Sequence, residues 1–290
     1  MYTILFLREW PVEGGPDGIA INPNGEVFVN INNSHRVVKF SSEGVRLAEW
    51  SFEGESSGIA VSPEGEVYVN INQNYRTLEY KTNGEVHVNI NNSHRVVKYS
   101  SEGVQIGEWS SEGESSGIAV SHEGEVFVNI NNNHRTLEYN PNNEVLVNIN
   151  NNHRIVKYSS DGVKLGEWPT EGASSGLAAS SNGELFSVNN LFHVVKSNNL
   201  GDLIAEWSVV AGVIETNGIV INPDGEVFVN INNNHRVVKY SPNGELLAEW
   251  GGKGDQPGEF RSPVGLALDP DGLLYVADKG NNRIQVFRPF

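Results

Sequence analysis

Residues 218–250 read GIVINPDGEVFVNINNNHRVVKYSPNGELLAEW, and close copies of this unit recur along the chain. Each copy opens with a Gly-Ile or Gly-Leu pair and closes with a Glu-Trp pair. A repeat of about 40 residues indicates a repeat architecture, which decides the whole fold. The opening glycines are Gly18, Gly58, Gly117, Gly176, Gly218 and Gly265, and the closing tryptophans, which are all six of the chain, are Trp10, Trp50, Trp109, Trp168, Trp207 and Trp250.

Each unit contains four short segments rich in β-branched and aromatic residues, and turn signals separate them. In the first complete unit these segments are 19–21, 27–31, 37–40 and 45–50. Apolar residues occupy both phases of the second and third segments, which is typical of strands covered on both faces. Four antiparallel strands in a unit of about 40 residues predict the blade of a β-propeller.

The two ends of the chain predict how the ring closes. The chain begins with a fourth-strand segment at 4–10 and ends with three further segments at 265–269, 273–277 and 283–287. Together these segments complete one blade and remove two sheet edges that would otherwise be exposed. We therefore predict an all-β fold, with residues 1–290 as a single closed β-propeller domain whose termini share the last blade.

The final unit, 265–287, reads GLALDPDGLLYVADKGNNRIQVF and resembles an NHL repeat. The segment 251–265, GGKGDQPGEFRSPVG, is similar to the family's link between blades. The other units replace the family's Val-Ala-Asp by Val-Asn-Ile, as at Val29–Ile31. The resemblance covers essentially the whole chain and implies a propeller of NHL-type repeats. It leaves the function open, because NHL propellers include protein binders, RNA binders, sensor domains and lyases.

The spacing of the opening glycines sets the expected number of blades. Units two and three each contain 19 additional residues, 84–102 and 143–161, which repeat a strand–turn–strand piece. Two added strands preserve the antiparallel order, so we predict six blades, with blades two and three enlarged to six strands by an extra hairpin. The alternative is eight blades, two of them with three strands, which eight sheets around the axis would reveal.

The net charge of −16, from 20 Lys and Arg against 36 Asp and Glu, disfavours phosphate-rich partners. We therefore expect no nucleic acid, and an acidic surface that favours basic or neutral partners. The absence of cysteine excludes disulfides, thiolate zinc sites and cysteine nucleophiles. The apolar segment 4–7 is too short for a signal-peptide core or a membrane span, so we expect a soluble chain without membrane insertion. The compartment stays open, extracellular and cell-surface locations included.

The Asn-rich tips between the second and third strands are the candidate binding surface. Alternate loops of a propeller emerge on one side, so these tips share a face with the links between blades. Two tips also contain Asn-x-Ser sequons at Asn32 and Asn91, which would carry glycans in an exported chain. The candidate ligand-binding residues are Asn32, His35, Arg36, Asn72, Arg76, Asn131, His134, Arg135, Asn232, His235 and Arg236.

Histidine and arginine recur at fixed positions of the repeat. Equivalent histidines stand around a ring, too far apart to share one metal ion, and the off-repeat His87, His122 and His193 do not converge. We therefore predict no metal site. We expect the His-Arg pair and its Asn neighbours to hydrogen-bond the hairpin backbone and each other, and each arginine to pair within its blade. The alternative is a ring of arginines that binds carboxylates or phosphates.

No residue stands out as a nucleophile, base or acid, and no nucleophile elbow, phosphate loop or HExxH motif is present. We predict no catalytic residue and no cofactor. The expected function is a non-catalytic binding or assembly scaffold for a protein, peptide or glycan, self-assembly included. A metal-assisted lyase or hydrolase is the alternative, and RNA binding ranks third. The fifth unit is irregular at 192–194, where either a specific contact or drift explains the change.

Overall fold

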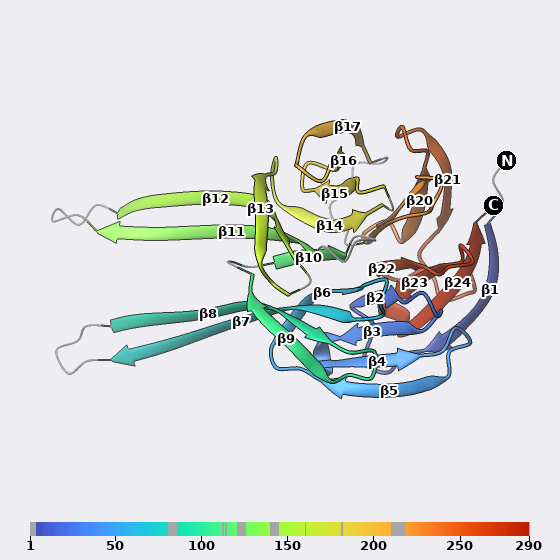
Figure 1. Ribbon diagram of the computed structural model, residues 1–290, viewed down its shortest axis with the longest axis horizontal. Helices are drawn as coiled ribbons and strands as arrows, with labels where there is room; N and C mark the ends of the chain where they lie inside the picture. Colours follow the sequence, from blue (N-terminus) through green and yellow to red (C-terminus); the bar gives the residue numbers. More distant parts are fainter. Residues whose placement is uncertain are drawn as a thin grey trace.

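The computed structural model describes residues 4–80, 86–111, 113, 115–120, 126–139, 145–159, 161–180, 182–209 and 218–289. These residues form 24 β-strands in six four-stranded antiparallel sheets, which Figure 1 shows from blue to red along the chain. In order of pairing, the first two sheets are β2 (Gly18–Ile21), β3 (Val27–Ile31), β4 (Arg36–Phe40) and β5 (Arg46–Ser51), and β6 (Glu55–Val61), β7 (Val67–Tyr80), β8 (Val86–Tyr99) and β9 (Gln105–Ser110). The next two are β10 (Ser115–Val120), β11 (Val126–Tyr139), β12 (Val145–Tyr158) and β13 (Lys164–Pro169), and β14 (Ser174–Ala179), β15 (Leu185–Asn189), β16 (His193–Ser197) and β17 (Leu203–Ser208). The last two are β18 (Ile219–Ile221), β19 (Val227–Ile231), β20 (Arg236–Tyr240) and β21 (Leu246–Gly251), and β22 (Pro263–Leu268), β23 (Leu274–Asp278), β24 (Arg283–Pro289) and β1 (Ile4–Pro11).

The first strand of each sheet contacts the first strands of two other sheets. Strand β2 contacts β6 and β22, β10 contacts β6 and β14, and β18 contacts β14 and β22. The second and third strands are apolar on both faces, and the residues of β3 and β19 are all buried. Each sheet is therefore covered by its neighbours on both sides, and the fold is an all-β propeller, as the repeat predicts.

Both ends of the chain lie in one sheet, as the sequence predicts. Strand β1 pairs antiparallel with β24, from Ile4 opposite Pro289 to Pro11 opposite Arg283. The two termini consequently lie side by side in Figure 1. The edge of β24 that would otherwise be unpaired is covered by a strand from the other end of the sequence.

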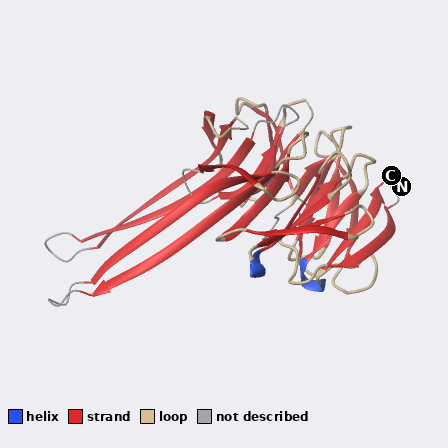
Figure 2. Ribbon diagram, turned by 60° about the horizontal axis from the view of Figure 1, so that its bottom comes forward, coloured by secondary structure: helices blue, strands red, loops and turns tan. Residues whose placement is uncertain are grey.

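The predicted extra hairpins of the second and third units are wrong, since both sheets have four strands. The added residues instead lengthen the two middle strands, so that β7, β8, β11 and β12 have 14 residues each. The physical reason is the register: Ile71 pairs with Arg95 and Arg76 pairs with Ile90, so the first Asn-rich stretch stays extended and pairs with the second. Figures 1 and 2 show the two long hairpins projecting side by side beyond the sheets.

The tryptophan of the outer strand contacts an aromatic ring of the next sheet at Trp10, Trp50, Trp109, Trp207 and Trp250. The Trp10 ring on β1 lies 6.0 Å from the Tyr275 ring of its own sheet and 6.3 Å from the Phe40 ring of the β2–β5 sheet. The same arrangement recurs at Trp50, which contacts Phe28 and Tyr99. Aromatic contacts of this kind stabilise a fold by more than their buried area alone. The tryptophan at this repeat position therefore stabilises the packing of neighbouring sheets.

A lysine buried in the third strand joins the two middle strands. The Lys39 ammonium lies 2.8 Å from a Glu26 oxygen and 5.7 Å from the centre of the Phe28 ring. Burial opposes the charged form of Lys39, but hydrogen bonds to Glu26 and Glu102 outweigh this and raise the pKa of Lys39. The equivalent ion pairs are Lys98–Glu66, Lys196–Glu184 and Lys239–Glu226.

Candidate functional site

The tip between the second and third strands of a regular sheet is a tight turn that ends on a left-handed residue, His35, His235 or Asn282. In the β2–β5 sheet, the turn η1 is Asn32–Ser34, and His35 follows with φ 47°. The last sheet has the turn η2 at Lys279–Asn281, and Asn282 follows with φ 52°. Figure 2 shows the two turns at the same face of the propeller. Asn and His populate left-handed backbone more often than most residues, which explains their alternation at this position.

The carbonyl of the left-handed residue joins the tip to the next link. The Phe52 amide donates to the His35 oxygen at 2.9 Å, and the Gly252 amide donates to the His235 oxygen at 2.8 Å. The same bond recurs from Val12 to the Asn282 oxygen, at 2.8 Å. The recurring histidine therefore has a backbone role that its side chain does not reveal.

The Asn32 side chain closes the tip onto the neighbouring sheet. Its Nδ2 donates to the Ser56 carbonyl at 2.6 Å, and its Oδ1 accepts from the Ser56 amide at 3.0 Å. The Asn32 amide donates to Asp17 Oδ2 at 2.8 Å. A glycan on Asn32 would be attached at the nitrogen that makes the first of these bonds. Glycosylation there stays a prediction that this geometry disfavours.

The histidine rings contact links between sheets. His35 Nδ1 lies 2.5 Å from the Gly54 carbonyl, and His235 Nδ1 accepts from the Ser262 amide at 3.0 Å. Burial lowers the pKa of His235, as do the charges of Lys253 and Arg261, whereas Asp278 opposes this shift. The neutral ring with its proton on Nε2 is the form that can accept the Ser262 amide. The partners lie in the link rather than in the hairpin itself, which corrects the expected contact within the hairpin.

The repeat arginines whose side chains are described pair within their own sheets, as predicted. Arg36 lies 3.4 Å from Glu49 of β5 and donates to the Glu13 carbonyl at 3.1 Å. Arg236 forms an ion pair with Glu249 of β21. The same Glu precedes each closing tryptophan, so the arginine ties the third strand to the fourth. Equivalent pairs are Arg95–Glu108 and Arg154–Glu167.

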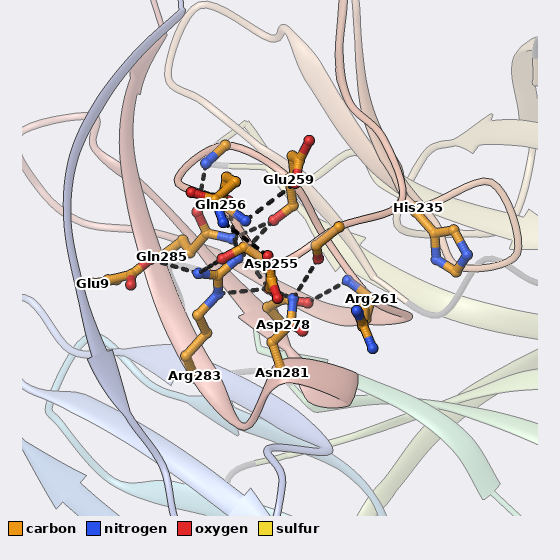
Figure 3. A network of polar contacts seen from close by, with 12 residues as sticks. Glu9, His235, Asp255, Gln256, Glu259, Arg261, Asp278, Asn281, Arg283 and Gln285 are labelled. Carbon is orange, nitrogen blue, oxygen red and sulfur yellow. Dashed lines mark hydrogen bonds and ion pairs between the residues drawn. The ribbon is translucent and has the colours of Figure 1, made fainter.

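Figure 3 shows a polar network in which Arg283 holds the link between the last two sheets. Its Nε donates to Asp278 Oδ2 and its Nη1 to Glu9 Oε2, both at 2.8 Å. Its guanidinium also donates to the carbonyls of Asp255, Gln256 and Glu259. All five donors are used, so this arginine is a structural residue of the link.

Most of the described side chains among the predicted tip residues thus hold the fold together. Asn232 differs, because its Oδ1 is buried and has no hydrogen-bond partner among the described residues. The predicted residues of the enlarged units are not at tips at all, because they lie inside long strands, and their side chains are outside the described part. These are Asn72, Arg76, Asn91, Asn131, His134 and Arg135.

Two further properties bear on function. Within the described residues, no group of three or more His, Asp or Glu side chains could hold a metal ion. His122 and the segment 210–217 lie outside the described residues. No described helix has the length and apolar character needed to cross a membrane.

Comparisons with known proteins agree on the repeat and the fold. The sequence model of the NHL repeat matches residues 260–287. The E3 ubiquitin-protein ligase TRIM71 of Xenopus tropicalis is 46% identical over 39 residues, and that of Bos taurus is 49% identical over 39 residues. These matches cover 13% of this chain and only 5% and 4% of the two relatives.

Solved structures resemble the whole chain at low sequence identity. A streptogramin B lyase structure has a TM-score of 0.62 at 15% identity and covers 100% of this chain and 98% of the lyase. A virginiamycin B lyase from Staphylococcus aureus has a TM-score of 0.63 at 12% identity and covers 99% of both chains. At such identities the likeness concerns the fold alone. The chain is therefore a β-propeller whose last sheet, with the link before it, contains an NHL repeat.

Proposed function

We propose that this chain is a non-catalytic binding scaffold that holds a protein or peptide partner on its two long hairpins, β7–β8 and β11–β12. The observation that carries the proposal is their projection side by side beyond the sheets (Figures 1 and 2). Strands of 14 residues are longer than a propeller blade needs, since the middle strands of the other sheets have five to seven. The described tips of the regular sheets are occupied by contacts that hold the fold together.

The scaffold in this proposal is a closed ring of six blades. Its support is the chain of contacts that leads from β2 through β6, β10, β14, β18 and β22 back to β2. A closed ring gives the hairpins a rigid base, because each sheet is covered on both sides and the last one is completed by β1.

The partner is inferred from charge. At −16, the chain attracts basic or neutral partners and repels phosphate backbones, so we propose a protein or peptide and no nucleic acid. The long hairpins also offer the strand edges of a narrow two-stranded ribbon, which another strand can extend by backbone pairing. A second copy of the chain is one such partner.

The sequence supplies a matched control that removes only the hairpins. Deleting 72–90 leaves Ile71 followed by Asn-Asn-Ser-His-Arg, which is the order of residues 31–36 in the β2–β5 sheet. Deleting 131–149 leaves Ile130 followed by Asn-Asn-Asn-His-Arg, the order of residues 231–236. The flanking pairs fit, because Ile71 already pairs with Arg95 and Ile130 with Arg154, as Ile31 pairs with Arg36.

The test compares the full chain with the trimmed chain. Light scattering reports self-assembly, and affinity capture with cross-linking and mass spectrometry identifies other partners. We expect the trimmed chain to keep its circular dichroism spectrum and cooperative unfolding but to lose the partner or the assembly. Equal binding by a folded trimmed chain would place the interaction elsewhere and overturn the proposal. A stoichiometric divalent ion in the purified protein would favour the metal-assisted enzyme instead.

A further inference from the structure

The β14–β17 sheet departs from the repeat at three positions on one face. In the β2–β5 sheet these positions hold Val29, Ile31 and Phe40, which belong to a single buried cluster with Trp10 of the preceding sheet. The equivalent residues of the β14–β17 sheet are serine, asparagine and serine, at Ser187, Asn189 and Ser197. The face that meets the preceding sheet has therefore lost a valine, an isoleucine and an aromatic ring.

This loss leaves a cavity of about 170 Å³ between the β10–β13 and β14–β17 sheets. From the preceding sheet and the link after it, the lining includes Trp168, Thr170 and Glu171. The β14–β17 sheet contributes Ser187, Asn189 and Ser197, together with Glu206 of β17. A cavity between packed sheets costs stability, so its retention with a polar lining needs a reason.

One buried group in the cavity has an unused hydrogen-bonding position. Asn189 is 3% exposed, and its Oδ1 accepts from the amides of Leu191 and His193 at 3.1 and 3.0 Å. Its Nδ2 has no hydrogen-bond partner among the described residues. The oxygen is fixed by the turn, so the NH₂ group of this cavity-lining residue is left as a buried donor without an acceptor in the described part of the chain. A buried donor without an acceptor is costly, and a ligand oxygen would satisfy it.

The rest of the lining restricts the chemistry of that ligand. Ser187 and Ser197 are 5% and 6% exposed, and their hydroxyls both donate and accept. The lining contains Glu171 and Glu206, the second of which also pairs with the ring of His193, and no Lys or Arg, so it does not suit an anion. A quaternary ammonium would suit the carboxylates and the indole but offers no acceptor to Asn189. A neutral molecule with hydroxyl groups on an apolar ring matches every group.

We propose that this cavity binds one neutral pyranose sugar unit, with its apolar C–H face against Trp168. Ring hydroxyls donate to the Glu206 and Glu171 carboxylates, and a sugar oxygen accepts from Asn189 Nδ2. The lining residues lie outside the segments 72–90 and 131–149 that the trimmed chain lacks. The sugar site therefore goes beyond the proposed scaffold function and can be tested independently of it.

The test measures binding of D-glucose, D-galactose, D-mannose and N-acetyl-D-glucosamine to the full chain by calorimetry and saturation-transfer NMR. Choline and D-glucuronate are the cationic and anionic comparisons. We expect at least one neutral sugar to bind with a 1:1 stoichiometry, and both comparisons to bind at least tenfold more weakly. The trimmed chain without 72–90 and 131–149 is expected to bind the same sugar equally well.

Two substitutions that restore the regular repeat locate the site. Ser197→Tyr supplies the aromatic ring that Tyr240 provides in the β18–β21 sheet and fills the cavity, so binding is expected to fall at least tenfold. Ser187→Val restores the residue at position 29, removes one hydroxyl and is expected to weaken binding about threefold to tenfold, a usual effect of one lost hydrogen bond. Ser208→Tyr, on an exposed position of the same sheet, is the control and should leave binding unchanged.

Three results would overturn the proposal. One is binding of none of the four sugars to the folded full chain, which would make the cavity a water-filled gap. Another is preferential binding of choline, which would make it a cation site. The third is unchanged sugar binding by folded Ser187→Val and Ser197→Tyr. If Ser197→Tyr does not fold, Ser187→Val alone decides.

Discussion

A glycine in the turn between the third and fourth strands is required by the tryptophan of the preceding sheet. Gly44 has φ +81°, and a Cβ built on it would lie 2.6 Å from the Trp10 ring. Two causes thus act at one residue, the left-handed backbone and the close approach of an indole. The same pairs recur as Gly103 with Trp50, Gly162 with Trp109, Gly201 with Trp168 and Gly244 with Trp207.

These two causes can be separated by two alanine substitutions. Gly272 has φ +75°, and a Cβ there would meet nothing within 4 Å. We expect Gly272→Ala to cost about 1–2 kcal/mol of unfolding free energy from the left-handed backbone alone. Gly44→Ala should cost about 1–3 kcal/mol more, because the methyl group displaces the Trp10 ring. Chemical denaturation measures both, and equal costs would contradict a role for the tryptophan.

His235 should make stability depend on pH. Its pKa is lowered in the folded state, so the unfolded chain binds the proton more readily. The stability is complete above the unfolded pKa of about 6.5 and falls as the pH decreases from there toward the folded pKa. His235→Asn, which keeps a residue suited to φ 55°, should remove that part of the loss. The measurement is the unfolding free energy of both proteins between pH 7.5 and 5, and parallel curves would count against this assignment.

Side-chain pairing at the tips could be predicted from the sequence, whereas the backbone there could not. The recurrence of Arg36 with Glu49 thirteen residues later is a pattern, and the structure pairs them. The left-handed conformation of His35 has a weaker signal, namely that Asn282 occupies the same repeat position in the NHL-like unit. An alternation of His and Asn at a turn indicates this conformation.

At the scale of elements, the local sequence of the long hairpins is compatible with two strand arrangements. Residues 71–76 and 90–95 can each close their own tip or pair with each other, and the side chains involved are nearly the same. The two arrangements conserve the antiparallel order, so strand parity does not distinguish them. Only the contacts of the whole sheet decide, and they give four strands rather than six.

The buried ion pair between the middle strands is a second element-scale feature. Glu26→Gln removes the charge that offsets the buried ammonium of Lys39, so we expect a loss of about 1–3 kcal/mol in unfolding free energy. Lys39→Met removes the buried ammonium and leaves only Glu26, whose side chain is 27% exposed, without its ion pair, so it should cost less than Glu26→Gln. Denaturation of both variants and of the double variant measures the coupling between the two residues. A larger cost for Lys39→Met would show that the lysine stabilises through more than its charge.

For the whole molecule, the repeated contacts join each sheet only to its neighbours, so the last sheet depends on β1. Trp10 contacts Tyr275 and Phe40, and Glu9 accepts from Arg283. The sequence predicted this sharing from the order of segments alone. The polar cavity beside Trp168 could not be predicted in the same way. The irregular residues of this unit are equally consistent with sequence drift, and a cavity is defined only by the packing of the β10–β13 sheet against them.

A circular permutant tests whether the fold depends on strand pairing or on the position of the chain ends. Ile4 lies opposite Pro289, so a short glycine-rich link can join the ends, and new ends can open between Asn24 and Gly25, in the turn between β2 and β3. The β2–β5 sheet is then the one completed by both ends, and every contact between sheets is retained. We expect cooperative unfolding with a midpoint within a few degrees of the parent. Removing residues 1–11 instead should cost at least about 3–5 kcal/mol, the usual effect of losing one core tryptophan, and expose the edge of β24. Thermal unfolding and light scattering compare the three proteins, and a truncated chain as stable as the parent would show that β1 does not stabilise the last sheet.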